Sequence, residues 1–229
     1  MDKIAPVVTL EWIQGGSQLN GNYFKEERVA RITVVETNFD GSRAVLTGDG
    51  TLSGWSTSGD THTATVRWNG DGHHQGTFKI SDLASNESNT VTMEEFVVDT
   101  VTPTLEISGV DNGVVYNKAP NIIITAHDIN LDIPASSVTL TSRSGNVTTL
   151  RGGFQGENGV FTFNAFGEDR RFDDLYTLTA VVKDKAGNSI DKSLKFILNR
   201  YGSLFDFSGI DYNGKYLNKA PSVALTENT

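Results

Sequence analysis

An internal repeat is the feature of this 229-residue sequence that most limits how it can fold. Residues 117–120, Asn-Lys-Ala-Pro, recur 101 positions later as residues 218–221. A second echo links residues 82–86, Asp-Leu-Ala-Ser-Asn, to residues 184–188, Asp-Lys-Ala-Gly-Asn, at a spacing of 102. Self-similarity at a fixed period is typical of arrays of one structural unit. The sequence therefore predicts domains of about 100 residues in tandem.

A third echo refines the domain limits. Glu36-Thr37-Asn38-Phe39-Asp40 corresponds to residues 128–132, Asp-Ile-Asn-Leu-Asp, 92 positions later, so the second unit has a longer middle section. We predict a first domain over residues 1–99, a second over 100–199 and the start of a truncated third repeat over 200–229. The joints at residues 99–103 and 199–202 are short, which favours a stiff rod over a flexible string.

Within each unit the pattern is that of β-strands. Tyr176, Leu178, Ala180 and Val182 occupy every second position, the period of a strand with one buried face. Further strands are predicted over residues 29–35, 63–68, 78–80, 91–98, 138–141, 160–163 and 190–198. No useful window has a helical period. Many short strands between Gly, Asn and Asp turns indicate an antiparallel sandwich, with a barrel as the alternative.

Several of these motifs together resemble a known family, the bacterial immunoglobulin-like domains arrayed in surface proteins and adhesins. The resemblance covers the whole second unit, from Asp99-Thr100-x-x-Pro103 through Asp128-x-Asn130-Leu131 to the stretch 176–188. It implies an all-β fold of two tandem immunoglobulin-like antiparallel β-sandwiches plus the start of a truncated third repeat. The first unit departs from the pattern, because His74 stands in the place of Tyr176 and Ser85 in that of Gly187.

Composition narrows the possible partners. The chain has 19 basic and 28 acidic residues, a net charge of −9, which argues against nucleic acid and against an anionic membrane surface. No run of apolar residues is long enough for membrane insertion. The chain has no cysteine, and this excludes disulfides and thiolate metal sites. With the resemblance, we expect an extracellular or cell-wall-associated protein whose signal and anchor lie outside this sequence.

Calcium at a joint between units is the metal hypothesis that the sequence offers. Asp99 opens the second unit, and its oxygens could converge on one cation with loop oxygens from Asp128 or Asp184. Residues 36–41 begin like a calcium loop, but the twelfth position is Thr47 instead of an acidic residue, and an EF-hand is rejected. Otherwise no cofactor is expected.

The sequence predicts no catalytic residues. It contains no nucleophile elbow, no Cys–His pair and no phosphate loop, so we expect a protein that is not an enzyme. Trp55, in a polar loop, and His73 are the candidate ligand contacts, although Phe154 stands in a place similar to that of Trp55 and suggests a packing role instead.

These observations favour a non-enzymatic structural or adhesive repeat module of an extracellular bacterial surface protein, acting as a stalk or spacer. The alternatives are a binding module that recognises a glycan or host protein through its loops, and an accessory domain of a secreted carbohydrate-active enzyme. The expected partners are a host or cell-surface glycan or protein and neighbouring repeats of the same polypeptide.

Overall fold

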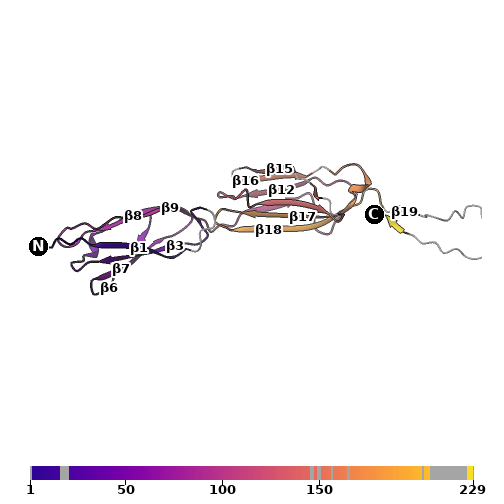
Figure 1. Ribbon diagram of the computed structural model, residues 1–229. Helices are drawn as coiled ribbons and strands as arrows, with labels where there is room; N and C mark the ends of the chain where they lie inside the picture. The colour runs from indigo at the N-terminus through magenta and orange to yellow at the C-terminus, as the bar shows by residue number, and fades with distance from the viewer. Residues whose placement is uncertain are drawn as a thin grey trace, which may run out of the picture. The chain divides into compact units, whose positions relative to one another are not determined.

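The chain is all-β, as predicted (Figure 1). The computed structural model describes residues 2–15, 21–144, 147–148, 151–155, 157–163, 166–202, 204–206 and 226–228. They form two compact units. The first contains Met1–Pro103, Asp128–Ala135 and Val182–Ile190, and the second contains Thr104–His127, Ser136–Val181 and Asp191–Thr229. The domain limits 1–99, 100–199 and 200–229 stay a prediction.

The first sandwich is built from strands β1 to β9. One sheet has the order β1 (Val7–Gln14), β3 (Arg28–Val35), β7 (Thr61–Trp68) and β5 (Thr51–Leu52). A fifth strand, β6 (Ser56–Ser58), also pairs with β7. The facing sheet has the order β2-β9-β8-β4: Tyr23–Phe24, Val91–Val98, Gly72–Ile80 and Ala44–Gly48. A short 3-10 helix, η1, covers Gly41–Arg43. All pairs are antiparallel except β2 with β9.

The second sandwich repeats this strand order, with one strand, β14, added at the end of the second sheet. One sheet has the order β10-β12-β16-β15: Thr104–Ser108, Ile122–His127, Asn158–Phe163 and Arg151–Gln155. The other has the order β11-β18-β17-β13-β14: Val115–Tyr116, Ser189–Leu198, Asp174–Lys183, Ser137–Ser142 and Val147–Thr148. The 3-10 helix η2 covers Arg170–Phe172. The parallel pair is again the short one, β11 with β18. Two separate sheets in each case make a sandwich and not the alternative barrel.

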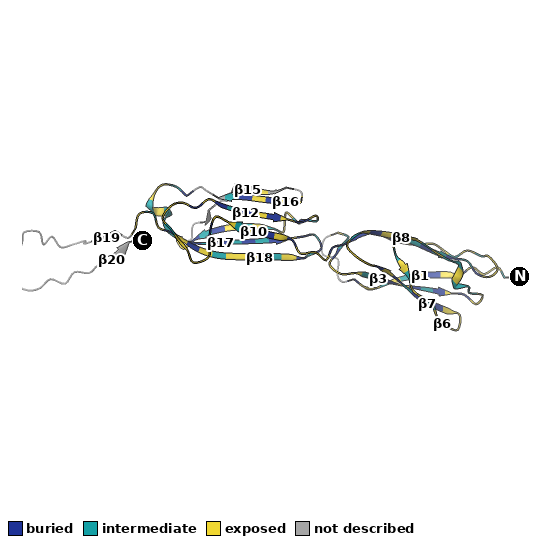
Figure 2. Ribbon diagram, turned by 180° about the vertical axis from the view of Figure 1, so that it is seen from behind, coloured by how far each residue is buried: buried dark blue, intermediate teal, exposed yellow. Residues whose placement is uncertain are grey.

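Each sandwich buries the side chains that alternate along its strands (Figure 2). In β17 the predicted inward residues Tyr176, Leu178, Ala180 and Val182 are all buried, while their neighbours are not. In the first sandwich Trp68 and Phe96 are buried and stack edge to face at 5.5 Å. Burying a large apolar side chain stabilises a fold by about 1.5–3 kcal/mol, so these alternating rows account for the two-layer architecture.

The last part of the chain contains the short antiparallel pair β19, Leu204–Asp206, with β20, Thr226–Asn228. Most of the predicted third repeat, residues 200–229, lies outside the described residues.

Candidate metal centre

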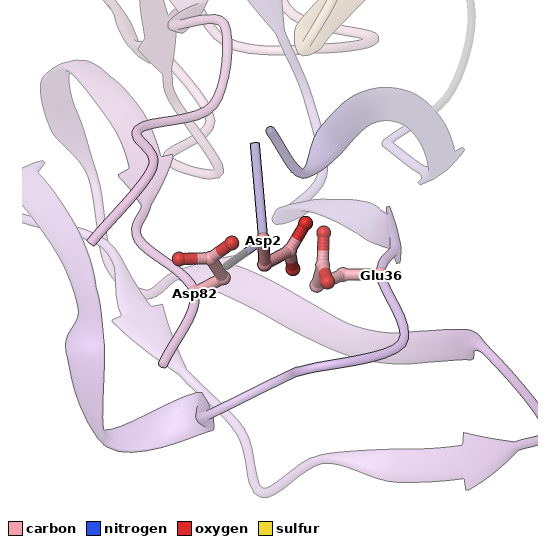
Figure 3. A group of neighbouring side chains, drawn as sticks. All are labelled: Asp2, Glu36 and Asp82. Carbon is pink, nitrogen blue, oxygen red and sulfur yellow. The ribbon is translucent and has the colours of Figure 1, made fainter. Parts of the chain in front are cut away.

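Three carboxylates from distant parts of the sequence meet at one end of the first sandwich (Figure 3). Asp2 precedes β1, Glu36 directly follows β3, and Asp82 lies between β8 and β9. One oxygen of each lies within 4.8 Å of those of the other two. Glu36 and Asp82 are buried and Asp2 is half-buried, with Asp2 between the other two in the figure. We call these residues the first acidic triad.

Two asparagines hold this triad in place. The backbone N–H of Asn38 donates to Glu36 Oε1 at 2.7 Å, and its side-chain amide donates to Asp2 Oδ2 at 2.7 Å. The backbone N–H of Asn86 donates to Asp82 Oδ1 at 2.8 Å, and its amide to Asp82 Oδ2 at 2.7 Å. Hydrogen bonds from N–H groups offset part of the cost of burying ionised carboxylates.

The residues predicted as metal ligands, Asp99, Asp128 and Asp184, form a second acidic triad. All three are buried, and one oxygen of each lies within 4.8 Å of those of the others. Asp99 precedes β10, Asp128 directly follows β12, and Asp184 directly follows β17. The structure thus places the three candidate residues close together. Whether they bind a metal stays a hypothesis.

Asparagines hold the second triad in the same way. The backbone N–H of Asn130 donates to Asp128 Oδ1 at 2.7 Å and its amide to Asp99 Oδ2 at 2.7 Å. The backbone N–H of Asn188 donates to Asp184 Oδ1 at 2.8 Å, and its amide to Asp184 Oδ2 at 2.6 Å. The amide of Asn188 also donates to the carbonyl oxygen of Asp99 at 2.8 Å.

The two triads correspond residue by residue. Glu36 matches Asp128 and Asp82 matches Asp184 at the spacings found in the sequence repeats. The counterpart of Asp99 is Asp2, which sequence reasoning missed. The signal that could have found it is a shared spacing, because Asp2 and Asp99 each stand four residues before a proline, Pro6 and Pro103.

The surroundings of the triads alter the acidity of two members. Burial raises the pKa of Asp184 above its usual value of 3.8, hydrogen bonds from Asn188 oppose that rise, and the nearby carboxylate of Asp99 adds to it. In the first triad, hydrogen bonds from the Ile4 amide and the Asn38 side chain lower the pKa of Asp2.

The donor set of each triad fits a hard divalent cation. Calcium takes oxygen ligands at about 2.3–2.6 Å, so two oxygens on opposite sides of one ion lie up to about 5 Å apart. The oxygens of each triad lie within 4.8 Å of one another, which satisfies that limit. Among the described residues, no Lys or Arg forms an ion pair with Asp2, Glu36, Asp82, Asp99 or Asp184.

Trp55 and His73, the two residues predicted to contact a ligand, pack against different side chains. Trp55 is half-buried, its ring meets Phe39 edge to face at 4.9 Å, and it packs on the core of the first sandwich. His73 is exposed, and its Nδ1 lies 2.6 Å from Glu95 Oε1. In the described part of the chain, no contact joins Trp55 to His73. The side chain of Phe154, compared with Trp55 above, lies outside the described residues.

His74 does take the place of Tyr176 structurally. The hydroxyl of Tyr176 donates to the carbonyl of Phe172, four residues earlier, at 2.8 Å. The Nε2 of His74 lies 3.0 Å from the carbonyl of Gly70, also four residues earlier. Both rings are buried, so the corner hydrogen bond of the second sandwich is kept in the first with a different side chain.

Two facing sheets in the same strand order, joined by Gly, Asn and Asp turns, define the class as immunoglobulin-like β-sandwich proteins. The bacterial Ig-like domain (group 3) family matches residues 60–200, more than half of the chain. The chain belongs to this family.

Several solved structures are similar to the chain at low identity. The Yersinia pseudotuberculosis adhesin InvE is 15% identical over 82% of this chain, with a TM-score of 0.36, and the chain spans 58% of that structure. The fibronectin(III)-like modules of Clostridium thermocellum CbhA are 13% identical over 83% of this chain and 94% of theirs, with a TM-score of 0.32. The tandem Ig repeats of Dlar are 10% identical over 85% of this chain and 98% of theirs, with a TM-score of 0.21.

No curated protein matches the chain. Within the residues that the structure describes, no helix is long and apolar enough to cross a membrane.

Proposed function

We propose that this chain is a non-enzymatic structural and adhesive module of a bacterial surface protein, acting as a stalk or spacer outside the cell. The observation that carries the proposal is that one architecture is built twice. Both sandwiches have the same strand order, and each has an acidic triad in the same three loops. Repetition of one fold with one loop arrangement suits a part that extends a polypeptide. The family to which the chain belongs is consistent with that setting.

We further propose that calcium binds the acidic triads and fixes their loops. In the second triad, the ion would hold Asp99, in the segment before β10, to Asp128 after β12 and Asp184 after β17. A ligand that binds the folded chain stabilises it by about 2.7 kcal/mol when its free concentration is a hundredfold above its Kd. Calcium would thus add to the hydrogen bonds by which Asn130 and Asn188 hold their loops to Asp99.

Calcium titration tests this part of the proposal. Thermal unfolding of the full chain is followed in EDTA, in calcium and in magnesium. Calcium should raise the midpoint, and magnesium should raise it less because it demands shorter, octahedral coordination. Asp128→Asn and Glu36→Gln each remove one charged ligand and should each lower the calcium response. Asp60→Asn changes an exposed aspartate and serves as the matched control. Equal midpoints in EDTA and excess calcium, with no heat of binding, would contradict the proposal.

A binding survey tests the stalk role against the alternative of a ligand-binding module. The immobilised chain is presented to a glycan array and to solubilised host surface proteins. A stalk should retain none of them above the level seen with an unrelated sandwich domain. Saturable binding that His73→Ala abolishes would contradict the stalk role and favour recognition through the loops. Attachment to a catalytic domain in the full-length protein would favour the accessory-domain alternative.

A further inference from the structure

In each sandwich, one aspartate stands immediately before the long strand β8 or β17. Asp71 precedes β8, which begins at Gly72, and Asp173 precedes β17, which begins at Asp174. Both aspartates accept hydrogen bonds from the segment that leaves the same sandwich. Asp71 accepts from Thr100, which lies two residues after β9. Asp173 accepts from Arg200, which lies two residues after β18.

In the first sandwich, Asp71 completes a run of bonded backbone amides. The N–H of Thr100 donates to Asp71 Oδ1 at 2.9 Å, and its hydroxyl donates to Oδ2 at 3.2 Å. On either side, the N–H of Asp99 donates to Phe24 O at 2.9 Å, and the N–H of Val101 donates to Asp99 Oδ1 at 3.1 Å. Three successive residues after β9 thus have fixed amides.

The second sandwich holds its exit segment more tightly. Asp173 Oδ2 accepts from the N–H of Arg200 at 2.7 Å and from the N–H of Tyr201 at 2.9 Å. Asp173 Oδ1 accepts from Arg200 Nε at 3.0 Å, and both side chains are largely buried, at 10% and 13% exposed. The N–H of Asn199 donates to Tyr116 O at 2.9 Å, as Asp99 does to Phe24. Again three successive amides are fixed.

Two further hydrogen bonds hold the segment that leaves the second sandwich against residues 169–170. Arg170 Nη2 donates to the carbonyl of Tyr201 at 2.9 Å, and Arg200 Nη2 donates to the carbonyl of Asp169 at 3.1 Å. The acidic and basic residues of the stretch 168–174 therefore have different roles. Asp169 and Arg171 form an exposed ion pair, whereas Asp173 is committed to Arg200.

We propose that Asp71 and Asp173 are exit clamps, which hold the peptide leaving each sandwich in one backbone conformation and protect it from proteolysis. Exposed connecting segments are the usual sites of nicking, and a protease must draw an extended stretch of chain into its cleft. Charge-assisted hydrogen bonds to successive amides oppose that extension. Because the clamps bind backbone N–H groups, they work with threonine in one exit and arginine in the other.

The peptide bond between Arg200 and Tyr201 makes a direct test, because trypsin recognises arginine. In the native chain, Arg200 is held by Asp173 and is withheld from the protease. The full chain is digested with trypsin under native conditions, and cleavage after Arg200 is timed by mass spectrometry. Asp173→Ala should speed this cleavage at least tenfold. Asp173→Asn, which keeps an acceptor oxygen but loses the charge, should have an intermediate effect.

Three controls separate local release from general loss of structure. Asp191→Ala changes an exposed aspartate of β18 and should leave the rate unchanged. Cleavage after the exposed Lys25 is the internal reference. Exchange of the buried Leu178 amide should stay slow in Asp173→Asn. An unchanged rate after Arg200, or an equal rise after Lys25, would overturn the proposal.

The first clamp is tested by hydrogen exchange, which reports local opening. Asp71→Ala should raise exchange of the Thr100 amide at least tenfold while the buried Val66 amide stays protected. Asp60→Ala, in an exposed turn of the same sandwich, should leave the Thr100 amide as slow as in the parent. Equal exchange at Thr100 in Asp71→Ala and in the parent would remove Asp71 from the proposal.

Discussion

The side-chain amide of Asn130 donates to a carboxylate oxygen of Asp99 at 2.7 Å and so ties the segment before β10 to the loop after β12. The backbone N–H of the same residue donates to Asp128 at 2.7 Å. One asparagine therefore orients two of the three carboxylates of the second acidic triad. Asn38 does the same for Asp2 and Glu36 in the first.

Replacing Asn130 with alanine should destabilise the second sandwich. Asn130→Ala removes the amide that donates to the buried Asp99, and hydrogen bonds to charged groups are each worth about 1.5–3 kcal/mol. The backbone bond to Asp128 stays. Hydrogen exchange of the buried Leu178 and Val66 amides measures the two sandwiches separately, and Leu178 should lose the protection. Asn69→Ala, in an exposed turn, is the control. Unchanged exchange at Leu178 in Asn130→Ala would show that the bond adds nothing to stability.

Equivalent turns in the two sandwiches place different residues at positive φ. Gly187 has φ +91°, and Ser85, its counterpart, has φ +70°. A non-glycine residue in this region costs about 1–3 kcal/mol, so Ser85→Gly should stabilise the first sandwich by up to about that amount. Gly187→Val should destabilise the second by about 1–3 kcal/mol, because a β-branched residue resists positive φ. The free energy of unfolding of Ser85→Gly is measured by urea unfolding with tryptophan fluorescence. That of Gly187→Val is measured by circular dichroism. If Ser85→Gly were destabilising or Gly187→Val stabilising, the turn would have to rearrange in that variant.

Trp55 is expected to matter for stability more than for binding. Its ring meets Phe39 at 4.9 Å and Phe78 at 6.1 Å, and Gly41 lies so close that an added Cβ would be 2.5 Å from its ring. Trp55→Ala should destabilise the first sandwich by about 2 kcal/mol, less than the roughly 3–5 kcal/mol of a core aromatic, because the ring is only half-buried. Trp55→Phe should cost less. Chemical denaturation measured by circular dichroism checks both. A variant as stable as the parent would return Trp55 to the candidates for ligand contact.

The strands that the sequence predicted well are those with one fully buried face. The predicted strand at residues 176–182 lies within β17, Asp174–Lys183, where buried and less buried positions alternate without a break. Only residues 78–80 of β8 were predicted, although β8 begins at Gly72. Two glycines, two histidines and a bulge between His74 and Gly76 hide the alternation of its first half. The strand β1 was missed because its outward residues Val7 and Ile13 are apolar too.

The second acidic triad could be predicted because two of its members lie in repeated motifs. Asp128 and Asp184 stand in loops that the internal repeats align, and Asp99 opens the second unit. The structure brings the three carboxylates together. Asp2 could not be found in the same way. It matches Asp99 only by its spacing to a proline, with no other identity around it. The exit clamps were hidden for a similar reason, because Asp173 bonds to backbone groups of Arg200 that carry no sequence signal.

The corner hydrogen bond of Tyr176 makes the second sandwich sensitive to alkaline pH. Its hydroxyl donates to Phe172 O at 2.8 Å, and burial, with the nearby charge of Asp174, raises its pKa to about 12. The folded state thus holds the phenolic proton more tightly than the unfolded chain, whose tyrosines ionise near pH 10. The stability from this group is fully present below about pH 10 and is lost as the pH rises through about 12.

Tyr176→Phe should lower stability at pH 7 by about 1 kcal/mol and flatten this alkaline loss. Hydrogen exchange at neutral pH, and urea unfolding at pH 8 and 11, measure the two effects. Tyr116→Phe is the matched tyrosine control. An alkaline loss of the same size in Tyr176→Phe as in the parent would assign the titration to another group.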